Sequence, residues 1–470
     1  MREVGLTHSS DETHESVWSE GVSWYTFLYS RNINFAREAR KKPMGTKRAE
    51  ISYILAKYGK VQNLIGYVNA ETLKAKHLEM PKRKASGVDE VTWEEYNANL
   101  DENINTLIAK MKKFGYRPQP AKRVYIPKAN GKLRPLGIPC YEDKLVASVM
   151  ADILNEVYEC LFLDTSYGFR PNRSCHDAVR ELNRIIGRCK VSYVLEADIR
   201  GYFDNVDQKQ LMEFIAHDIE DKNFSRYIVR FLKSGIMEEG KYHETDKGTA
   251  QGSPISPILA NVYLHYVLDI WFAYLKSHCA FRGEAYIVRY ADDFIMLFQY
   301  KSDAEKMYQT LPKRLRKFGL ELAMDKTKIV AFGRFAKLNS KNGRTESFDF
   351  LGFTFCNGTT RNGKYRVYIQ TSKKKLKAKK QAVKEWLKEH MHAPVSTTFE
   401  TLNRKLQGHV NYYGINGNFK MLSNFFQYTK MALIRVLRAR GQKHPIKWTD
   451  FQRMWDYYIK PPKISVNIWL

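Results

Sequence analysis

The sequence predicts an α+β protein, because strand-like segments alternate with helical ones without the strict repeat of a parallel α/β fold. Three hairpin signals support the strands. One surrounds Asn130 and Gly131, one surrounds an acidic turn within residues 286–300, and one surrounds Asn362 and Gly363. With 470 residues and 44% hydrophobic content, the chain is long enough for about three domains.

The N-terminal part is predicted to be helical. Residues 1–75 form an extension that we expect to be partly disordered or helical, because its first 20 residues are acidic and lack periodicity. Thr92, followed by acidic residues, predicts a capped amphipathic helix that ends at Gly115. Alternating residues on both sides of Asn130 and Gly131 then predict the first hairpin.

Strands and helices follow in the middle of the chain. The segment up to Asp198 has the pattern of a strand that ends in acidic residues, and residues 286–300 have the pattern of two strands around a turn. Ser302 is the expected cap of a helix that stops near Gly319. A long apolar stretch from Ser253 contains too many polar residues for a comfortable membrane span, so we expect a buried helix there.

The charge points to a polyanionic partner. The net charge is +27 and the pI is about 9.6, far more positive than solubility requires. Residues 371–470 alone carry 20 Lys and Arg against 5 Asp and Glu, so more than half of the excess lies in the last fifth of the chain. Nucleic acid is favoured over an anionic membrane as the partner.

The six cysteines are scattered, with no C-x-x-C pair and no histidine at zinc spacing. This pattern predicts neither a disulfide framework nor a zinc module, and it fits a reducing cytoplasm. The first residues lack the apolar core of a secretory signal. We therefore expect a cytoplasmic protein that uses no zinc and no membrane.

The acidic turn within residues 286–300 carries two adjacent aspartates, Asp292 and Asp293. Aspartate is common in turns, but the apolar flanks would bury this hairpin, and uncompensated buried carboxylates cost several kcal/mol each. A third carboxylate, Asp198, stands at the end of another predicted strand. Three such groups make a hard oxygen site suited to Mg²⁺, and two ions there would activate an attacking 3′-hydroxyl and stabilise a leaving pyrophosphate.

The chain resembles a reverse transcriptase of the group II intron maturase type, from about Ala85 to Trp455. The motifs occur in the family's order: "ASGVDE", "RVYIPKANGKLRPLGIP", "SYGFRPNRSCHDA", "EADIRGYFDNV", "GTAQGSPISPILANVYL", "YADD", "LAMDKTKI", "FDFLGFTF" and "LNRKLQGHVNYYG". The resemblance implies a right-hand polymerase, with fingers at 76–190, a palm with an antiparallel sheet and remaining fingers elements at 191–369, and a basic helical thumb or maturase domain at 370–470. It also implies an RNA-directed DNA polymerase that supports intron splicing and retrohoming.

The same resemblance assigns metal and proton-transfer roles. Asp198, Asp292 and Asp293 match the family's metal carboxylates for two Mg²⁺ ions, with the backbone carbonyl of Ile199 as a further ligand and Asp293 contributing less directly. Lys326 matches the lysine proposed as general acid for pyrophosphate. Without the motif, Lys326 is an ordinary surface lysine.

Five residues match the dNTP site. Phe203 matches the aromatic residue that excludes a 2′-hydroxyl, and its alternative role is core packing. Lys128 and Arg134 flank the first hairpin turn and would hold the triphosphate; the alternative is exposed turn charge. Gln251 and Gly252 lie where the backbone approaches nucleotide or template. Ala250 replaces the proline that the family usually has there, which predicts a slightly more flexible loop.

Nucleic-acid contacts are assigned to basic residues. Arg170 and Arg173 are expected to touch template phosphates or to stabilise the fingers. The C-terminal cations would line a groove for an RNA/DNA duplex: Lys373, Lys374, Lys375, Lys377, Lys379, Lys380, Arg435, Arg438 and Arg440. Tyr412 and Tyr413 are aromatic residues of the same region that we assign to the core rather than to base stacking.

Three functional hypotheses remain. The first is an intron-encoded protein that splices its intron RNA as a maturase and copies that RNA into DNA, from a DNA primer, during retrohoming. Such a protein would be in the bacterial cytoplasm and would associate with the nucleoid when bound to its DNA target. The second is a domesticated relative in defence or DNA repair, and the third is a splicing cofactor without polymerase activity. The intact aspartates speak against the third. Because no cysteine follows Cys356, we expect no zinc-organised endonuclease. The sequence leaves the oligomeric state open.

Overall fold

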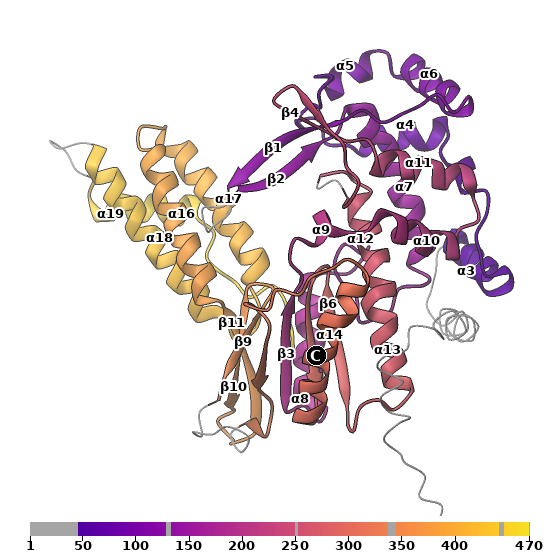
Figure 1. The fold of residues 1–470 in the computed structure, drawn as a ribbon. Helices are drawn as coiled ribbons and strands as arrows, with labels where there is room; N and C mark the ends of the chain where they lie inside the picture. The colour runs from indigo at the N-terminus through magenta and orange to yellow at the C-terminus, as the bar shows by residue number, and fades with distance from the viewer. Residues whose placement is uncertain (1–45, 128–132, 250–251, 337–344, 441–445, 470) are drawn as a thin grey trace, which may run out of the picture.

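A computed structural model describes residues 46–127, 133–249, 252–336, 345–440 and 446–469. The predicted N-terminal arm, the Asn130-Gly131 turn, and the site residues Lys128 and Gln251 lie outside these ranges. Figure 1 shows three parts: helices from the N-terminal half on one side, stacked sheets below, and a group of C-terminal helices on the other side.

The N-terminal half is mainly helical, as expected. Its helices are α3 (Thr46–Tyr58), η1 (Leu64–Tyr67), α4 (Ala70–Glu79), α5 (Trp93–Ala98), α6 (Leu100–Lys112), α7 (Tyr141–Tyr158) and α8 (Cys175–Arg188). Thr92 caps α5, and the backbone N–H of Thr92 donates in turn to the Glu95 carboxylate. The single helix predicted from Thr92 to Gly115 is wrong, because Asn99 leaves the helical conformation and separates α5 from α6. Asparagine is a weak helix former, and its side chain competes for backbone hydrogen bonds.

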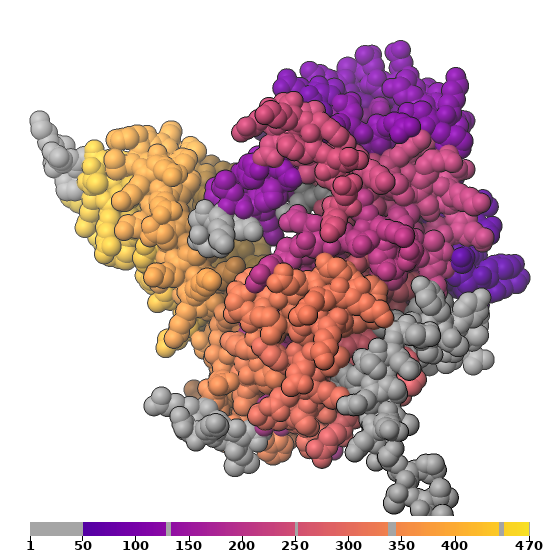
Figure 2. Space-filling model, viewed as in Figure 1, coloured from indigo at the N-terminus to yellow at the C-terminus, as the bar shows by residue number. Residues whose placement is uncertain are grey.

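The first predicted hairpin is confirmed by strands β1 (Ala121–Pro127) and β2 (Leu133–Ile138), which pair antiparallel. They belong to a sheet of order β2-β1-β4-β5 with β4 (Ile236–Glu238) and β5 (Lys241–His243). In Figure 1 the hairpin extends from the N-terminal part toward the C-terminal helices, and Figure 2 shows those helices as a lobe to one side.

The central sheet has the order β6-β7-β3-β8, and every neighbouring pair is antiparallel. Its strands are β3 (Tyr193–Asp198), β6 (Ala285–Tyr290), β7 (Asp293–Phe298) and β8 (Lys328–Ala331). The predicted strand before Asp198 and the predicted hairpin within residues 286–300 are therefore confirmed. The register pairs Asp198 directly with Asp293, so residues about 95 positions apart meet at one edge of the sheet.

Helix α14 (Lys301–Lys317) packs on β3, β7 and β8 of this sheet, and α8 packs on β6. Three helices lie between β3 and β4 in the sequence, namely α9 (Tyr202–Asn205), α10 (Gln208–Asp218) and α11 (Lys222–Leu232), and α10 packs on α11 and on α12 (Ser256–Leu264). The predicted cap at Ser302 is wrong, because Tyr300 is the N-cap of α14 and Ser302 lies in its first turn. The predicted stop is confirmed, since the chain takes a positive φ at Gly319 just after the helix ends. Its buried Leu311 and Leu315 join a core that also contains the inner faces of α7 and β3.

The long apolar stretch forms one continuous helix of α12 (Ser256–Leu264), the π-helical turn η2 (His265–Asp269) and α13 (Ile270–Ser277). Among the described helices, this one is long and apolar enough to cross a membrane by length and composition. However, 89% of its apolar window is buried inside the fold. The prediction of a buried helix is confirmed.

The third sheet, of order β11-β10-β9, joins the C-terminal helices. Its strands are β9 (Ser347–Phe350), β10 (Phe353–Thr359) and β11 (Tyr365–Thr371), and Gly363 has the positive φ of the predicted turn. Helices α16 (Lys373–Glu389), α17 (Val395–Tyr413), α18 (Phe419–Arg440) and α19 (Trp448–Tyr458) follow. Tyr413 is buried and the Tyr412 ring stacks on Phe353, which confirms the assignment of both tyrosines to the core.

Candidate functional site

The three predicted metal carboxylates lie together at the edge of the central sheet. Asp198 ends β3, Asp293 begins β7, and Asp292 occupies the turn between β6 and β7. Side chains opposite each other in an antiparallel pair are about 5 Å apart at Cβ, and like charges there repel. The apolar residues around the turn hold the carboxylates at this edge, so the sheet concentrates negative charge at one point.

The pKa values of the two turn aspartates reflect this crowding. Burial, together with the charges of Asp198 and Asp292, raises the pKa of Asp293 to about 7, against one hydrogen bond from the backbone N–H of Leu351. Burial and Asp198 also raise the pKa of Asp292, whereas Arg134 and Arg289 lower it. These surroundings disfavour the ionised form of the two carboxyl groups, and a bound cation would stabilise that form.

Lys326 lies beside the carboxylates. The segment before it runs along the end of β3, where Ala323 N donates to Asp198 O and Ile199 bridges Leu322. Lys326 Nζ then lies 2.5 Å from Asp198 Oδ2, and this hydrogen bond raises the pKa of the lysine. Lys326 therefore stays protonated at neutral pH.

The three carboxylates have the right chemistry for Mg²⁺ but do not form a closed cage. Carboxylate oxygens are the ligands that Mg²⁺ prefers, and it takes only one or two of them alongside substrate phosphates. Within the described ranges, no three His, Cys, Asp or Glu side chains make a ready metal cluster. One carboxylate, Asp198, is paired with Lys326. The residues thus fit an ion that is shared with substrate.

We expect Asp293→Asn to stabilise the metal-free protein at pH 8. The folded state holds the Asp293 proton up to about pH 7, whereas the unfolded chain releases it near pH 4. The metal-free fold therefore loses stability as the pH rises between these values. Because one pKa unit corresponds to about 1.4 kcal/mol, the amide should raise the free energy of unfolding by at least about 1 kcal/mol.

This prediction is checked by urea unfolding in EDTA at pH 4 and pH 8. The gain should be present at pH 8 and absent at pH 4, where the folded aspartate is already neutral. Asp101→Asn on the exposed start of α6 is the control, with no expected gain at either pH. An Asp293→Asn protein that is no more stable at pH 8 would contradict the crowding described above.

The β1–β2 hairpin places Arg134 within electrostatic reach of the site, since its charge lowers the pKa of Asp292. Arg134 is exposed on β2, so its guanidinium is accessible to an anionic ligand. Gly252 has φ +116°, and an added Cβ would come within 2.0 Å of the Gly137 carbonyl oxygen. Close contact with β2 therefore requires glycine at this position. This requirement comes from packing inside the protein, and the sequence did not reveal it.

Phe203 lies on α9, five residues after Asp198. It is half-buried against the core, and its ring makes edge contacts with Tyr202 and Phe169, at centroid distances of 5.5 and 6.3 Å. Both of its predicted roles remain compatible with this position, because part of the ring is packed and part is accessible.

The predicted nucleic-acid role of Arg170 is wrong. Its side chain is 2% exposed and binds both carboxylate oxygens of Glu159, at 2.7 and 3.0 Å. The same guanidinium donates to the carbonyls of Leu163 and Ser166. All three nitrogens of this guanidinium donate inside the protein, in four hydrogen bonds, which leaves the alternative role of stabilising the fingers. Arg173 is similarly tied to Asp164 at 2.5 Å, although part of its side chain is exposed.

We expect Arg170→Ala to lower the free energy of unfolding by about 3–5 kcal/mol, because it leaves the buried Glu159 carboxylate without its partner. Chemical denaturation measures this loss. RNA affinity per folded molecule should not change. Lys374→Ala, which removes an exposed cation of α16, is the contrasting variant and should leave the unfolding midpoint unchanged. A stable Arg170→Ala protein with weakened RNA binding would reverse this correction.

The C-terminal cations differ in accessibility. Most of those on α16 are exposed, namely Lys373, Lys374, Lys375, Lys377 and Lys379, as are Arg435 and Arg438 on α18. Lys380 instead donates to Asn424, and Arg440 donates to the carbonyl of Ala393. These last two contribute to the packing of the C-terminal helices, so the exposed cations are better placed to contact phosphates.

Sequence reasoning missed three contacts at or beside the site. The backbone N–H of Leu351 donates to Asp293, and Tyr412 donates to the carbonyl of Leu351 at 2.9 Å. Phe169 contacts Phe203. Leu351 and Phe169 both have positive φ without being glycine, a conformation that often marks functional positions, but no sequence pattern reveals it.

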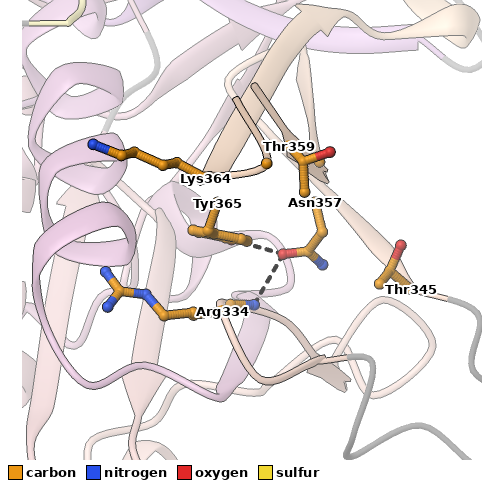
Figure 3. Close-up of a pocket in the computed structure, with 9 residues that line it drawn as sticks. Arg334, Thr345, Asn357, Thr359, Lys364 and Tyr365 are labelled. Carbon is orange, nitrogen blue, oxygen red and sulfur yellow. Dashed lines mark hydrogen bonds between the residues drawn. The ribbon is translucent and has the colours of Figure 1, made fainter. Parts of the chain in front are cut away.

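A cavity of about 690 Å³ lies elsewhere, between the end of β8 and the β10–β11 hairpin, and none of the predicted site residues lines it. Figure 3 shows Asn357 at its centre, where Oδ1 accepts hydrogen bonds from Tyr365 and from the backbone of Gly333. Arg334 and Lys364 supply positive charge. The candidate active site is therefore the open edge of the central sheet and not this cavity.

Comparison with known proteins identifies two family regions. Residues 126–355 match the reverse transcriptase (RNA-dependent DNA polymerase) family, and residues 376–455 match the group II intron maturase-specific domain. The first region contains all three aspartates, and the second covers most of α16–α19.

Two relatives align with more than half of this chain. The group II intron-encoded protein LtrA of Lactococcus lactis subsp. cremoris is 31% identical, over 72% of this chain and 68% of that protein. Protein YkfC of Escherichia coli is 32% identical, over 60% of this chain and 78% of that protein. A solved structure of telomerase from Candida albicans aligns with 73% of this chain and 64% of its own, at a TM-score of 0.41 and 14% identity.

The fold class and the activity predicted from sequence are thereby confirmed. The α+β architecture with an antiparallel central sheet is that of a right-hand polymerase, and the carboxylates lie at the edge of that sheet within the reverse transcriptase region. The chain belongs to the group II intron-encoded proteins, as an RNA-directed DNA polymerase that carries a maturase-specific domain.

Proposed function

We propose that this protein copies intron RNA into DNA by Mg²⁺-dependent nucleotidyl transfer at the edge of the central sheet. The observation that carries the proposal is the meeting of Asp198, Asp292 and Asp293, which are brought together by strand register. Asp198 and Asp292, with the carbonyl of Ile199 and a smaller contribution from Asp293, would hold two Mg²⁺ ions. When bound, these ions supply Lewis acidity at the attacking 3′-oxygen and at the leaving pyrophosphate.

The other residues bind and orient the substrates. Arg134, together with Lys128, would hold the triphosphate of the incoming dNTP, and the exposure of Arg134 beside Asp292 supports this role. Phe203 would exclude a 2′-hydroxyl. Lys326, which stays protonated beside Asp198, would give its Nζ proton to the leaving pyrophosphate. Gln251 and Gly252 would border the nucleotide.

Intron RNA, a DNA primer or target strand, and the RNA/DNA duplex would bind along the basic C-terminal helices. The exposed cations of α16 and α18 and the maturase-specific match over 376–455 support this placement. Contacts with phosphates release counterions, so the affinity should fall steeply with salt. Splicing of the host intron and its retrohoming into DNA, in the bacterial cytoplasm, would follow from the same binding.

Metal removal tests the proposal. Purified protein should extend a DNA primer on an RNA template with dNTPs and Mg²⁺, lose this activity in excess EDTA, and regain it when Mg²⁺ is restored. Ca²⁺ is the matched control, because it binds the same oxygen ligands with looser geometry and should restore little extension. Extension that persists after complete chelation would refute the metal-dependent mechanism.

A further inference from the structure

Arg289, three residues before Asp292, is fully buried and every part of its guanidinium is engaged. Nε and Nη2 donate to the two carboxylate oxygens of Asp269, at 2.7 and 2.5 Å. Nη1 donates to Asn261 Oδ1 and to the backbone carbonyl of Ala291, both at 3.0 Å. A buried charge is tolerated when it is paired and hydrogen-bonded in this way, so the arrangement is fixed rather than adaptable.

The π-helical turn brings Asn261 and Asp269, whose side chains accept hydrogen bonds from Arg289, onto the same face of their helix. In a regular α-helix, residues about seven apart lie on one face, because 3.6 residues make a turn. Asn261 and Asp269 are eight apart, and the turn η2 (His265–Asp269) between them widens the helix locally. A π turn absorbs one additional residue, and such turns are frequent at functional sites. Both side chains are thereby aligned toward Arg289.

One arm of this network holds the metal-binding turn. Ala291, whose carbonyl accepts from Arg289, has φ +57°, an unfavourable conformation for a residue with a side chain. Gly168 lies against the same turn, where an added Cβ would come within 2.4 Å of Ala291 N. The backbone just before Asp292 is thus fixed from two sides.

The other arm reaches the sugar-selecting ring. Asn261 Nδ2 donates to the carbonyl of Gly168 at 2.6 Å. The next residue, Phe169, has φ +56° and makes an edge contact with Phe203. The network therefore connects the turn that carries Asp292 with the segment that borders Phe203.

We propose that Arg289, Asp269 and Asn261 form a buried clamp that positions Asp292 and Phe203 relative to each other, so that metal binding and sugar selection share one support. This inference rests on the proposed function, which gives Asp292 and Phe203 their roles. Arg289, Asp269 and Asn261 are positioning residues, since none of them touches substrate in the proposed site.

Replacing both Arg289 and Asp269 separates the effect of the ion pair on the position of Asp292 from its effect on the stability of the fold. Arg289→Met alone leaves the Asp269 carboxylate buried without a partner and should lower the melting temperature. Adding Asp269→Leu removes that charge, and an apolar pair of similar volume is often as stable as a buried ion pair. The double variant should regain most of the stability that Arg289→Met loses, but it has no donor for the Ala291 carbonyl or for Asn261 Oδ1.

In the double variant, the melting temperature is largely restored but kcat for dNTP incorporation should not be. The clamp predicts a kcat at least about tenfold below that of the unaltered protein, which corresponds to about 1.4 kcal/mol in the activation barrier. The KM for the primer-template should be unchanged. The affinity for Mn²⁺, measured by electron paramagnetic resonance, should fall. Normal kcat and normal Mn²⁺ binding in the restored double variant would overturn the clamp. Activity that survives in Asp292→Ala would instead refute the metal assignment.

The second arm has a matched control. Asn261→Leu removes the hydrogen bond to Gly168, together with one of the two acceptors of Arg289 Nη1. It should lower the preference for dNTP over rNTP by about threefold or more in kcat/KM, which is about 0.65 kcal/mol. Asn418 is an equally buried asparagine that joins Thr371 to Tyr413 in the C-terminal region. Asn418→Leu should cost similar stability and leave the preference unchanged. Equal preferences in the two variants would overturn the second arm.

Discussion

Replacing Asp292 and Asp293 together by alanine is expected to abolish primer extension while RNA binding survives. Each metal ion contributes several kcal/mol to the stabilisation of the transition state, and about 1.4 kcal/mol corresponds to a tenfold change in rate. Loss of both carboxylates should therefore reduce the rate by at least about a thousandfold. RNA affinity depends on the basic residues, of which residues 371–470 alone carry 20.

Primer extension with labelled primer and filter binding with the same RNA measure the two properties on one preparation. Asp101→Ala with Glu102→Ala is the control, because it also removes two adjacent acids, from the exposed first turn of α6. It should leave both properties unchanged. If the Asp292 and Asp293 double variant extends primers at the normal rate, the metal assignment fails. If it loses RNA binding as well, the separation between the sheet edge and the basic helices fails.

Phe203→Val is expected to admit ribonucleotides. The ring would occupy the space of a 2′-hydroxyl, and valine leaves that space open. The ratio of kcat/KM for a dNTP over the matching rNTP should fall by about tenfold or more, which is about 1.4 kcal/mol of discrimination. Single-nucleotide incorporation on an RNA template measures this ratio directly.

Because Phe203 is also packed on the core, the variant loses some stability, and a control for this loss is necessary. Phe214 on α10 stacks on Tyr266 at 4.7 Å, inside the core. Phe214→Val should destabilise the fold by a similar mechanism and keep the normal ratio. An unchanged ratio in Phe203→Val, or the same change in both variants, would assign Phe203 to packing alone.

Local sequence signals predicted the elements of the site well. Alternation and turn residues predicted the hairpin around Asp292 and the strand that ends at Asp198, since these patterns follow from backbone geometry. The break at Asn99 was missed, because one weak helix former inside an amphipathic pattern is compatible with either outcome. The cap of α14 was also missed, because its N-cap Tyr300 has no capping side chain that a sequence pattern could reveal.

The role of a cation was the least predictable property. In the sequence, Arg170, Lys374 and Arg289 are alike, each a basic residue within a recognised motif or helix. The fold buries Arg170 on Glu159, exposes Lys374 to solvent, and places Arg289 beneath the turn that carries Asp292. Burial and pairing depend on partners distant in the chain, and these decide whether a charge binds phosphate or stabilises the protein.

The sequence by itself determined the chemistry available to this protein, namely three carboxylates after strand-like runs, a basic C-terminal region and an ordered set of reverse transcriptase motifs. Tertiary structure alone decided how those groups act on one another. The register of β3 with β7 sets Asp198 against Asp293, and the π-helical turn aligns Asp269 with Asn261 under Arg289. Hydrogen bonds and Coulomb interactions act over a few ångströms in space, and only the folded backbone sets those distances.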